Sequence, residues 1–303
     1  MTKRHVGLPE SAQADLGAFV DAVDARLAGD EDDYEVVRDV LVDLNGDRER
    51  YERWQRGDSV SSVECARFRS YDPHGATLES EYYADGDADA FERSKPLQWL
   101  WRQFDNTPVA DNVDVAVAFR EMLAGHLFAE AGENLRLFRG ITMTYGHNVT
   151  LGDNVVIHDD VHLDDRGQLS VGDRVSVADS THVYTHSHDV VDQTEVTNYR
   201  TVLEDDARLG YDSVVQAGVR VGENAMVGSR ALVNADVPAH HVAVGTPARS
   251  VRVKPGWESV ADEVEAANVD RREERALDST VRVSETERFD EFGRDRDRDP
   301  PDG

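Results

Sequence analysis

Histidine side chains gather in one part of this chain, and histidine is the residue best suited to proton transfer near neutral pH. Six of the 11 histidines lie between residues 147 and 188. One such imidazole can act as a general base, because its pKa lies near the working pH, or several can bind a metal ion together. His186 and His188 share one face of a strand, which is compatible with chelation. The six are His147, His158, His162, His182, His186 and His188.

These histidines lie inside a segment that repeats every six residues, from about residue 141 to residue 252. Glycine often follows the repeating aliphatic residue, as at Gly152 and Gly210, and a register of smaller residues comes two positions before it. A helix would repeat near 3.6 residues and a single strand every two, so neither explains the pattern. The aliphatic register consists of Leu151, Ile157, Leu163, Val171, Val177, Val183, Leu209, Val215, Val221, Val227 and Val233.

The six-residue period predicts a triangular coil. Each hexad supplies a short strand whose inward side chains fill the interior, and a tight turn follows where glycine or aspartate tolerates the bend. Three sides close one coil, and coils stack at about 4.8 Å through parallel strand hydrogen bonds. One coil cannot bury its own inner face, so several must stack. The sequence therefore predicts a mainly β protein, a parallel β-helix.

Three motifs in the repeat resemble those of the hexapeptide-repeat acyltransferases, most closely the maltose and galactoside O-acetyltransferases. They are Tyr-Gly-His-Asn at 145–148, Tyr-Thr-His-Ser-His at 184–188 and Gly-Thr-Pro-Ala-Arg at 245–249. The resemblance covers residues 124–252 and implies a left-handed coil, an exception to the usual hand of crossovers, and a homotrimer. It further implies transfer of an acetyl group from acetyl-CoA, a co-substrate, to a hydroxyl of a small sugar-like acceptor, with no permanently bound cofactor.

The resemblance also implies roles for single residues on the acceptor side. His188 falls on the position of the family's catalytic histidine and would be the general base, whereas His186 falls where the family does not require histidine. Asp165 matches an aspartate that contacts acceptor hydroxyls, and His158 stands where the family has a neighbouring asparagine. A metal site like that of the hexapeptide-repeat carbonic anhydrases fits less well, because paired ligands there are five residues apart. No metal is therefore expected.

On the donor side, the matches are to residues that contact coenzyme A. Arg208 stands where the family often has tryptophan, and a backbone N–H near Tyr211 would stabilise the oxyanion. Basic residues near the closing turn suit the nucleotide phosphates of coenzyme A, and they stand out in so acidic a chain. The residues expected to bind coenzyme A are Arg208, Tyr211, Ser229, Thr246, Pro247 and Arg249, with Arg252 or Lys254 as additional cations.

Composition limits the partners. The chain has 61 Asp and Glu against 33 Lys and Arg, a net charge of -28, which disfavours nucleic acid and anionic membrane. This excess of carboxylate with few lysines is typical of a protein from a high-salt cytoplasm, where salt screens the self-repulsion. Cys65 is the only cysteine, so neither a disulfide framework nor an acyl-enzyme within the coils is expected. No signal peptide or apolar span is apparent, so we expect a cytoplasmic protein.

The repeat sits between two regions of different character. Residues 1–135 are predicted to be mostly helical, with a short strand near 76–84, and residues 136–256 to form the β-helix domain. Residues 257–303 are predicted to be an acidic tail, helical over about 261–275 and disordered from residue 290.

Several alternatives stay open at this point. Asp164-Asp165-Arg166-Gly167 could be a solvated turn that bulges from the coil, and the helices before the repeat could simply pack their own core. A long polar loop at 189–201 would, by the resemblance, cover the active site of an adjacent subunit. Other functions compatible with the pattern are a serine acetyltransferase-like enzyme and a non-catalytic trimeric scaffold or sugar-binding module.

Overall fold

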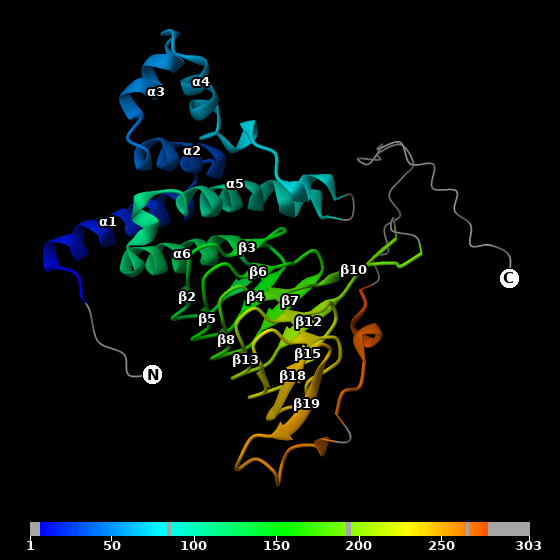
Figure 1. Cartoon of the computed structure of the whole chain (residues 1–303). Coiled ribbons are helices and arrows are strands. Elements are labelled where there is room, and N and C mark those ends of the chain that lie inside the picture. Colours follow the sequence, from blue (N-terminus) through cyan, green and yellow to red (C-terminus); the bar gives the residue numbers. More distant parts are fainter. Residues whose placement is uncertain (1–6, 84–85, 192–194, 265–266, 278–303) are drawn as a thin grey trace.

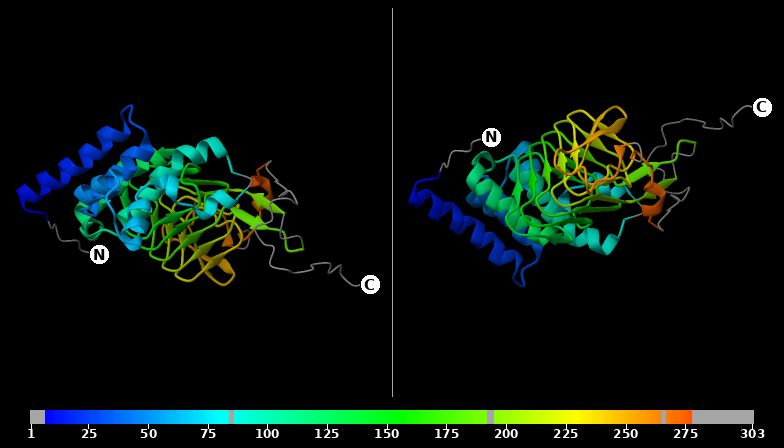
Figure 2. Two further views of the ribbon diagram at one scale, coloured as in Figure 1. Left: turned by 90° about the horizontal axis from the view of Figure 1, so that it is seen from above. Right: turned by 90° about the horizontal axis from the view of Figure 1, so that it is seen from below.

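The computed structural model describes residues 7–83, 86–191, 195–264 and 267–277. Within these residues the chain forms a solenoid of stacked parallel strands with a group of helices at one end (Figure 1). Seen from above and below, the coils are stacked behind one another and the helices lie across the first of them (Figure 2). The predicted left-handed parallel β-helix with a helical N-terminal region is confirmed.

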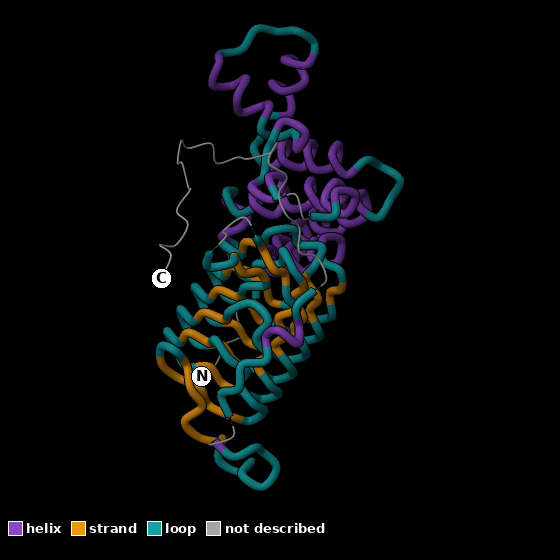
Figure 3. Tube along the Cα trace, turned by 90° about the vertical axis from the view of Figure 1, so that its right-hand side faces the viewer, coloured by secondary structure: helices purple, strands orange, loops and turns teal. Residues whose placement is uncertain are grey.

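Three sheets, here called A, B and C, make the sides of the triangle. Each coil visits them in this order, so strands one coil apart pair in parallel, as in Figure 3. Sheet A consists of β1 (Glu130–Ala131), β4 (Val149–Leu151), β7 (Gln168–Val171), β12 (Arg200–Leu203) and β15 (Arg220–Val221). Sheet B consists of β2 (Arg136–Leu137), β5 (Val156–Ile157), β8 (Ser176–Val177), β13 (Arg208–Leu209), β16 (Met226–Val227), β18 (His241–Gly245) and β19 (Ala248–Val253). Sheet C consists of β3 (Thr142–Met143), β6 (His162–Leu163), β9 (His182–Val183), β14 (Val214–Val215) and β17 (Leu232–Val233).

The side chains of the two sequence registers fill the inside of the coil. All eleven aliphatic residues of the six-residue count are buried, and so are the smaller residues two positions before them, down to Thr181 and Ser213. The smaller residues fill the turns, where the interior narrows, and the larger ones fill the middle of each side. The periodicity therefore predicted the direction of every one of these side chains.

The corner between sheets A and B shows why glycine and aspartate occur together in the repeat. The carboxylate of Asp173 accepts the backbone N–H of Asp153 one coil away at 2.9 Å, and Asp205 does the same for Asp173 at 3.0 Å. Glycine precedes Asp153 and Asp173 because the coils approach closely: a Cβ on Gly152 would lie 2.4 Å from the Asp173 carboxylate and 2.8 Å from its nitrogen. Each of these aspartates therefore caps the coil before it, and the glycine of that preceding coil leaves room for the carboxylate.

The region before the coils is helical, as predicted. Its helices are α1 (Glu10–Leu27), α2 (Asp33–Leu44), α3 (Arg48–Gln55), α4 (Ser62–Arg69), α5 (Ala88–Phe104) and α6 (Val113–Leu127), with short 3-10 helices η1 (Pro73–Gly75), η2 (Glu79–Tyr82) and η3 (Pro108–Asp111). The predicted strand near residues 76–84 is wrong, since η2 occupies it. The Glu81 side chain accepts the backbone N–H of Leu78 at 2.7 Å and so stabilises a turn there.

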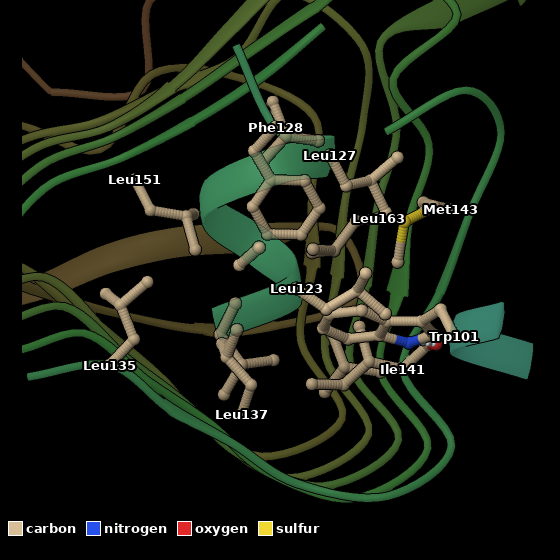
Figure 4. Packing of buried hydrophobic residues seen from close by; sticks show 14 of the residues in the cluster. Trp101, Leu123, Leu127, Phe128, Leu135, Leu137, Ile141, Met143, Leu151 and Leu163 are labelled. Atoms are coloured by element: carbon tan, nitrogen blue, oxygen red, sulfur yellow. Dashed lines mark hydrogen bonds between the residues drawn. The ribbon is translucent and has the colours of Figure 1, made fainter. Parts of the chain in front are cut away.

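Helices α5 and α6 close the open end of the β-helix. Leu123 and Leu127 of α6 lie among the inward side chains of the first coils, beside Leu137 and Met143 (Figure 4). Trp101 of α5 donates its indole N–H to the carbonyl of Ile141 at 2.9 Å. The helices and coils thus share one continuous hydrophobic core, and the first coil is protected from water and from pairing with another chain.

The chain after the coils runs back along their outside. A short 3-10 helix, η5 (Arg272–Arg275), is the element found there, so the helix predicted over 261–275 is wrong for the described residues. Individual hydrogen bonds hold the segment against the coils instead. Ser250 donates its N–H to Asn268 at 2.8 Å, and Leu277 donates its N–H to the carbonyl of Asn198 at 2.8 Å. The disorder predicted from residue 290 lies outside the described residues.

Candidate active site

His188 lies on a hairpin that leaves the coil at the corner between sheets C and A. Strand β10 (His186–His188) pairs antiparallel with β11 (Val196–Asn198), and the pair extends away from the coils in Figure 1. His188 is exposed, and its ring stands edge-to-face against the ring of His186 at a centroid distance of 5.4 Å. The predicted base is therefore on an exposed arm, next to a second imidazole.

A buried carboxylate fixes the root of this arm. Asp164 is 1% exposed, and its Oδ2 accepts the backbone N–H of Thr185 at 2.8 Å and lies 2.7 Å from Nδ1 of His186. Its Oδ1 accepts the hydroxyl of Thr144 at 2.9 Å. Burial alone would raise the pKa of Asp164, but the hydrogen bond and charge of His186, with those from Thr185 and Thr144, lower it to about 2. Asp164 is thus ionised at neutral pH.

Sequence reasoning missed Asp164. Its turn had the alternative interpretation of a solvated bulge, and the structure contradicts that interpretation, because Asp164, Asp165 and Arg166 are all buried. The one feature of the sequence that pointed to Asp164 was its position directly after Leu163, an inward-facing residue of the repeat. Only the path of the hairpin brings it to His186, 22 residues later.

Asp165 does not fit the predicted contact with an acceptor hydroxyl. It is fully buried, and its carboxylate accepts the backbone N–H groups of Thr144 at 3.0 Å, Tyr145 at 2.7 Å and Asn148 at 3.2 Å. Burial raises its pKa to about 7, against the effect of these amides. Asp165 therefore organises the turn that carries the Tyr-Gly-His-Asn motif instead of facing a ligand.

More of the clustered histidines line the outside of sheet C beside this arm. The ring of His162 lies 5.7 Å from that of His182 and 5.8 Å from that of Tyr184, and all three are half-buried. Burial lowers the pKa of His162, which favours its neutral form. Among the residues that the structure describes, no three His, Cys, Asp or Glu side chains are placed to hold a metal ion.

Two of the residues expected to bind coenzyme A lie at another corner, between sheets B and C. Tyr211 and Ser229 follow β13 and β16 one coil apart, and Arg230 donates its N–H to the carbonyl of Tyr211 at 2.8 Å. Thr246 continues this line, since its hydroxyl donates to the carbonyl of Arg230 at 3.2 Å. The Tyr211 side chain is 47% exposed. Tyr211, Ser229 and Thr246 therefore lie along one edge of the coil stack.

The predicted cations lie at both ends of the last hairpin. Arg249 follows Pro247 in the closing turn and donates to Asn234 Oδ1 at 3.0 Å. Lys254, at the other end, donates to Asn224 Oδ1 at 2.7 Å, and its pKa is lowered by burial and by the nearby charge of Arg208. The basic residues therefore do not form one patch: Arg208 and Lys254 are neighbours, and Arg249 lies apart from them.

His158 and Asp165, which were both expected to contact the acceptor, also lie at different corners of the coil. His158 follows β5 at the corner between sheets B and C and stacks on Phe138 at 5.1 Å, whereas Asp165 is at the corner between sheets C and A. One chain therefore does not bring His188 together with His158, Tyr211, Ser229 and the closing turn. The two groups of predicted residues occupy different corners of the triangle.

The coils with their six-residue repeat give this chain a hexapeptide-repeat fold similar to that of solved acetyltransferases. The structure is similar to that of a maltose O-acetyltransferase from Clostridium difficile 630, with a TM-score of 0.51, 25% identity, and coverage of 59% of this chain and 98% of that one. It is also similar to a galactoside acetyltransferase solved in complex with coenzyme A, with a TM-score of 0.49, 24% identity, and coverage of 56% and 84%. The resemblance seen in the sequence is confirmed at the level of the fold.

Similarity in sequence to a known protein extends over a shorter segment of the chain. A 2,3,4,5-tetrahydropyridine-2,6-dicarboxylate N-acetyltransferase of Staphylococcus aureus (strain JH9) is 39% identical over 66 residues, which are 22% of this chain. The match spans only 28% of that relative's length. No family model matches the chain. Among the described residues, none of the helices has the length and apolar character to cross a membrane.

Proposed function

We propose that this chain is a coenzyme A-dependent O-acetyltransferase whose active site forms between subunits of a homotrimer. The observation that carries the proposal is the exposed imidazole of His188 on an arm of a β-helix that has the fold of a maltose O-acetyltransferase. A cytoplasmic location and a sugar-like acceptor belong to the same proposal.

The separation of the two corners supports a site between subunits. In one chain the arm with His188 leaves from one corner, and the line of Tyr211, Ser229 and Thr246 follows another. Val190 and Val191, next to the end of β10, are 94% and 86% exposed. Exposed apolar side chains at the end of an arm suit contact with a second copy of the chain. A trimer would bring one subunit's arm to the next subunit's donor corner.

The proposed chemistry is direct transfer. His188 takes the proton of the acceptor hydroxyl as the oxygen attacks the thioester carbonyl of acetyl-CoA. The tetrahedral oxyanion is stabilised by a backbone N–H at the donor corner near Tyr211. When the C–S bond breaks, the coenzyme A thiolate receives the proton from His188, and the acetyl ester leaves. Neither a metal ion nor an acyl-enzyme takes part in this proposal.

A second acceptor class is favoured by one observation. The curated relative that shares 39% identity over 66 residues is an N-acetyltransferase by its name. An amine could replace the hydroxyl in the same transfer, with His188 again taking a proton from the attacking group. The acceptor panel must therefore contain amines and amino acids as well as sugars.

The test is release of free thiol from acetyl-CoA in high salt across that panel, for wild type, His188→Ala and the control His126→Ala. His126 lies on α6, hydrogen-bonded to Asp24 and away from both corners. We expect turnover that His188→Ala lowers at least about 100-fold and His126→Ala leaves unchanged. Equal turnover in wild type and His188→Ala would refute His188 as the base. Binding of coenzyme A without turnover on any acceptor would instead support a scaffold or binding module.

A further inference from the structure

The ring next to His188 is held far more firmly than an exposed surface histidine. His186 is half-buried, with 20% of its side chain exposed, and both its backbone N–H and its Nδ1 face Asp164, at 3.2 and 2.7 Å. Asp164 is itself surrounded by Thr144, Thr185 and the N–H of Arg166. Two of these contacts are to the backbone where β10 begins, so the carboxylate holds the start of the strand as well as the ring.

This arrangement fixes the tautomer of His186. A buried ionised carboxylate can only accept hydrogen bonds, so Nδ1 of His186 must carry the hydrogen. In the neutral ring the lone pair is then on Nε2. The ring can neither flip nor rotate without breaking the 2.7 Å contact and leaving a buried charge with one partner fewer.

His188 rests against this fixed ring. The two imidazoles are two residues apart on β10, and their edge-to-face contact has a centroid distance of 5.4 Å. Other charged or titratable groups nearby are His162 on β6, which is close enough to His186 for their charges to interact, and Arg166, whose guanidinium lies 4.3 Å from the ring of Tyr83. The ring of His186 is in edge-to-face contact with that of His188, and this contact joins the base to the buried carboxylate.

We propose that Asp164 and His186 form a positioning pair for the base His188. The carboxylate orients the His186 ring, and that ring restricts the rotation of His188 on its exposed arm, so that the base meets the acceptor in one orientation. The pair moves no proton in this proposal. The inference rests on the proposed function, because it assigns a role around the same base.

The test uses His186→Asn. The Asn amide occupies nearly the place of Nδ1 and still donates to Asp164, but the ring that faces His188 is lost. The matched control is His182→Asn, which removes a half-buried ring from the neighbouring strand β9. Folding is checked by thermal melting and by the oligomeric state. Turnover of the best acceptor and the side-chain NMR signals of His188 are then measured in the full-length protein.

We expect His186→Asn to fold like wild type and to lower kcat about 10- to 100-fold, the cost of misplacing a catalytic group by a fraction of an ångström, with the KM for acetyl-CoA unchanged. The His188 ring signals should show rotamer averaging in this variant and not in His182→Asn. Wild-type kcat and unchanged His188 signals in His186→Asn would overturn the proposal, because Asp164 and His186 would then serve only the fold. If wild type shows no turnover, the proposed function fails, and the NMR comparison still decides the positioning pair.

Discussion

At the scale of single residues, Asp164 and Asp165 show how two residues adjacent in sequence take different structural roles. Asp164 is paired with an imidazole and faces the root of the arm, whereas Asp165 accepts only backbone N–H groups inside a turn. Burial raises the pKa of both carboxyl groups, but the hydrogen bond and charge of His186 lower that of Asp164 to about 2, whereas that of Asp165 rises to about 7. The local sequence Leu-Asp-Asp-Arg does not distinguish them.

The low pKa of Asp164 predicts sensitivity to acid. A carboxylate with a depressed pKa stabilises the fold above its ordinary pKa near 4, and this contribution is lost as the pH falls toward 2. The shift is worth about 2 kcal/mol. Urea unfolding between pH 5 and pH 2 should therefore show a smaller loss of stability for Asp164→Asn than for wild type. The control is Asp179→Asn, at another corner of the same coil, which should follow wild type. Parallel curves for wild type and Asp164→Asn would contradict the prediction.

A second residue-scale prediction concerns glycine at the coil corners. In Gly152→Ala the new Cβ would lie within 2.8 Å of Asp173 atoms of the next coil, including its backbone nitrogen. Since the backbone of a stacked coil cannot move away freely, we expect a loss of about 1 to 3 kcal/mol. Gly17→Ala, within α1 and with no atom within 4 Å of the new Cβ, should instead raise stability by about 0.5 to 1 kcal/mol. Thermal melting of the two variants measures the contrast, and equal melting temperatures would refute it.

At the scale of elements, the arm carrying His188 depends on the chain that follows the coils. Tyr199, just after β11, forms a bridge with Ala276, and its hydroxyl donates to Glu273 at 3.2 Å. Leu277 bonds the carbonyl of Asn198, within β11 itself. In Figure 1 this segment climbs the outside of the coils to reach the hairpin. Residues 273–277, part of the region predicted to be an acidic tail, therefore contact the arm that carries His188 and support it.

Removal of this support should loosen the hairpin and leave the coils intact. We predict that a chain ending at residue 266 shows faster amide hydrogen exchange in β10 and β11, because the contacts of Asn198 and Tyr199 with 273–277 are gone. Exchange in β13 and β14, inside the coil stack, should not change. A chain ending at residue 277 is the control and should behave like the full-length protein. Equal protection of β10 and β11 in both shortened chains would show that the tail does not hold the arm.

At the scale of the whole molecule, the candidate site is divided between corners that one chain keeps apart. A fixed triangular coil cannot fold one side onto another, so residues at two corners meet only across copies. The arm, with Val190 and Val191 exposed, is the element that can reach a neighbour. This separation supports our proposal that copies of the chain assemble, and the assembly that we propose is a trimer.

Mixed assemblies test this arrangement. His188→Ala keeps the donor corner, and Ser229→Trp, which fills that corner, keeps the arm. If each site uses an arm and a corner from different subunits, random co-assembly of equal amounts should restore about a quarter of wild-type activity, because three quarters of the trimers are mixed and each mixed trimer has one intact site in three. Each variant assembled alone is the inactive control. No recovery in mixed trimers would place the whole site within one chain.

The net charge of -28 leads to a prediction for the whole molecule in salt. Carboxylates spread over a compact surface repel one another, and raising salt from 0.1 M to 1 M shortens the screening length from about 10 Å to about 3 Å. We expect the melting temperature to rise steeply with KCl over this range. A neutral osmolyte at the same osmolality should raise it much less, since it does not screen charge. A melting temperature independent of KCl would argue against adaptation to a salty cytoplasm.

The solenoid was predictable from the sequence, because a six-residue period with glycine and aspartate at its corners buries the aliphatic positions when coils stack. The sequence also predicted a long polar loop at 189–201, directly after His188, whereas the structure has β11 and the start of β12 within that range. The mostly helical character of residues 1–135 was also predictable, because periodic burial is a local property of the chain.

Tertiary structure alone decided the surroundings of the site. Asp164 meets His186 only because the hairpin leaves at one corner and passes the turn of the coil before it, and Asp165 is buried by the turn beside it. The last segment lacks a period of its own, and its course is set by contacts with β11 and the coil surface. Such contacts join residues 17 to 79 positions apart, and neither spacing nor residue type within a short window encodes them.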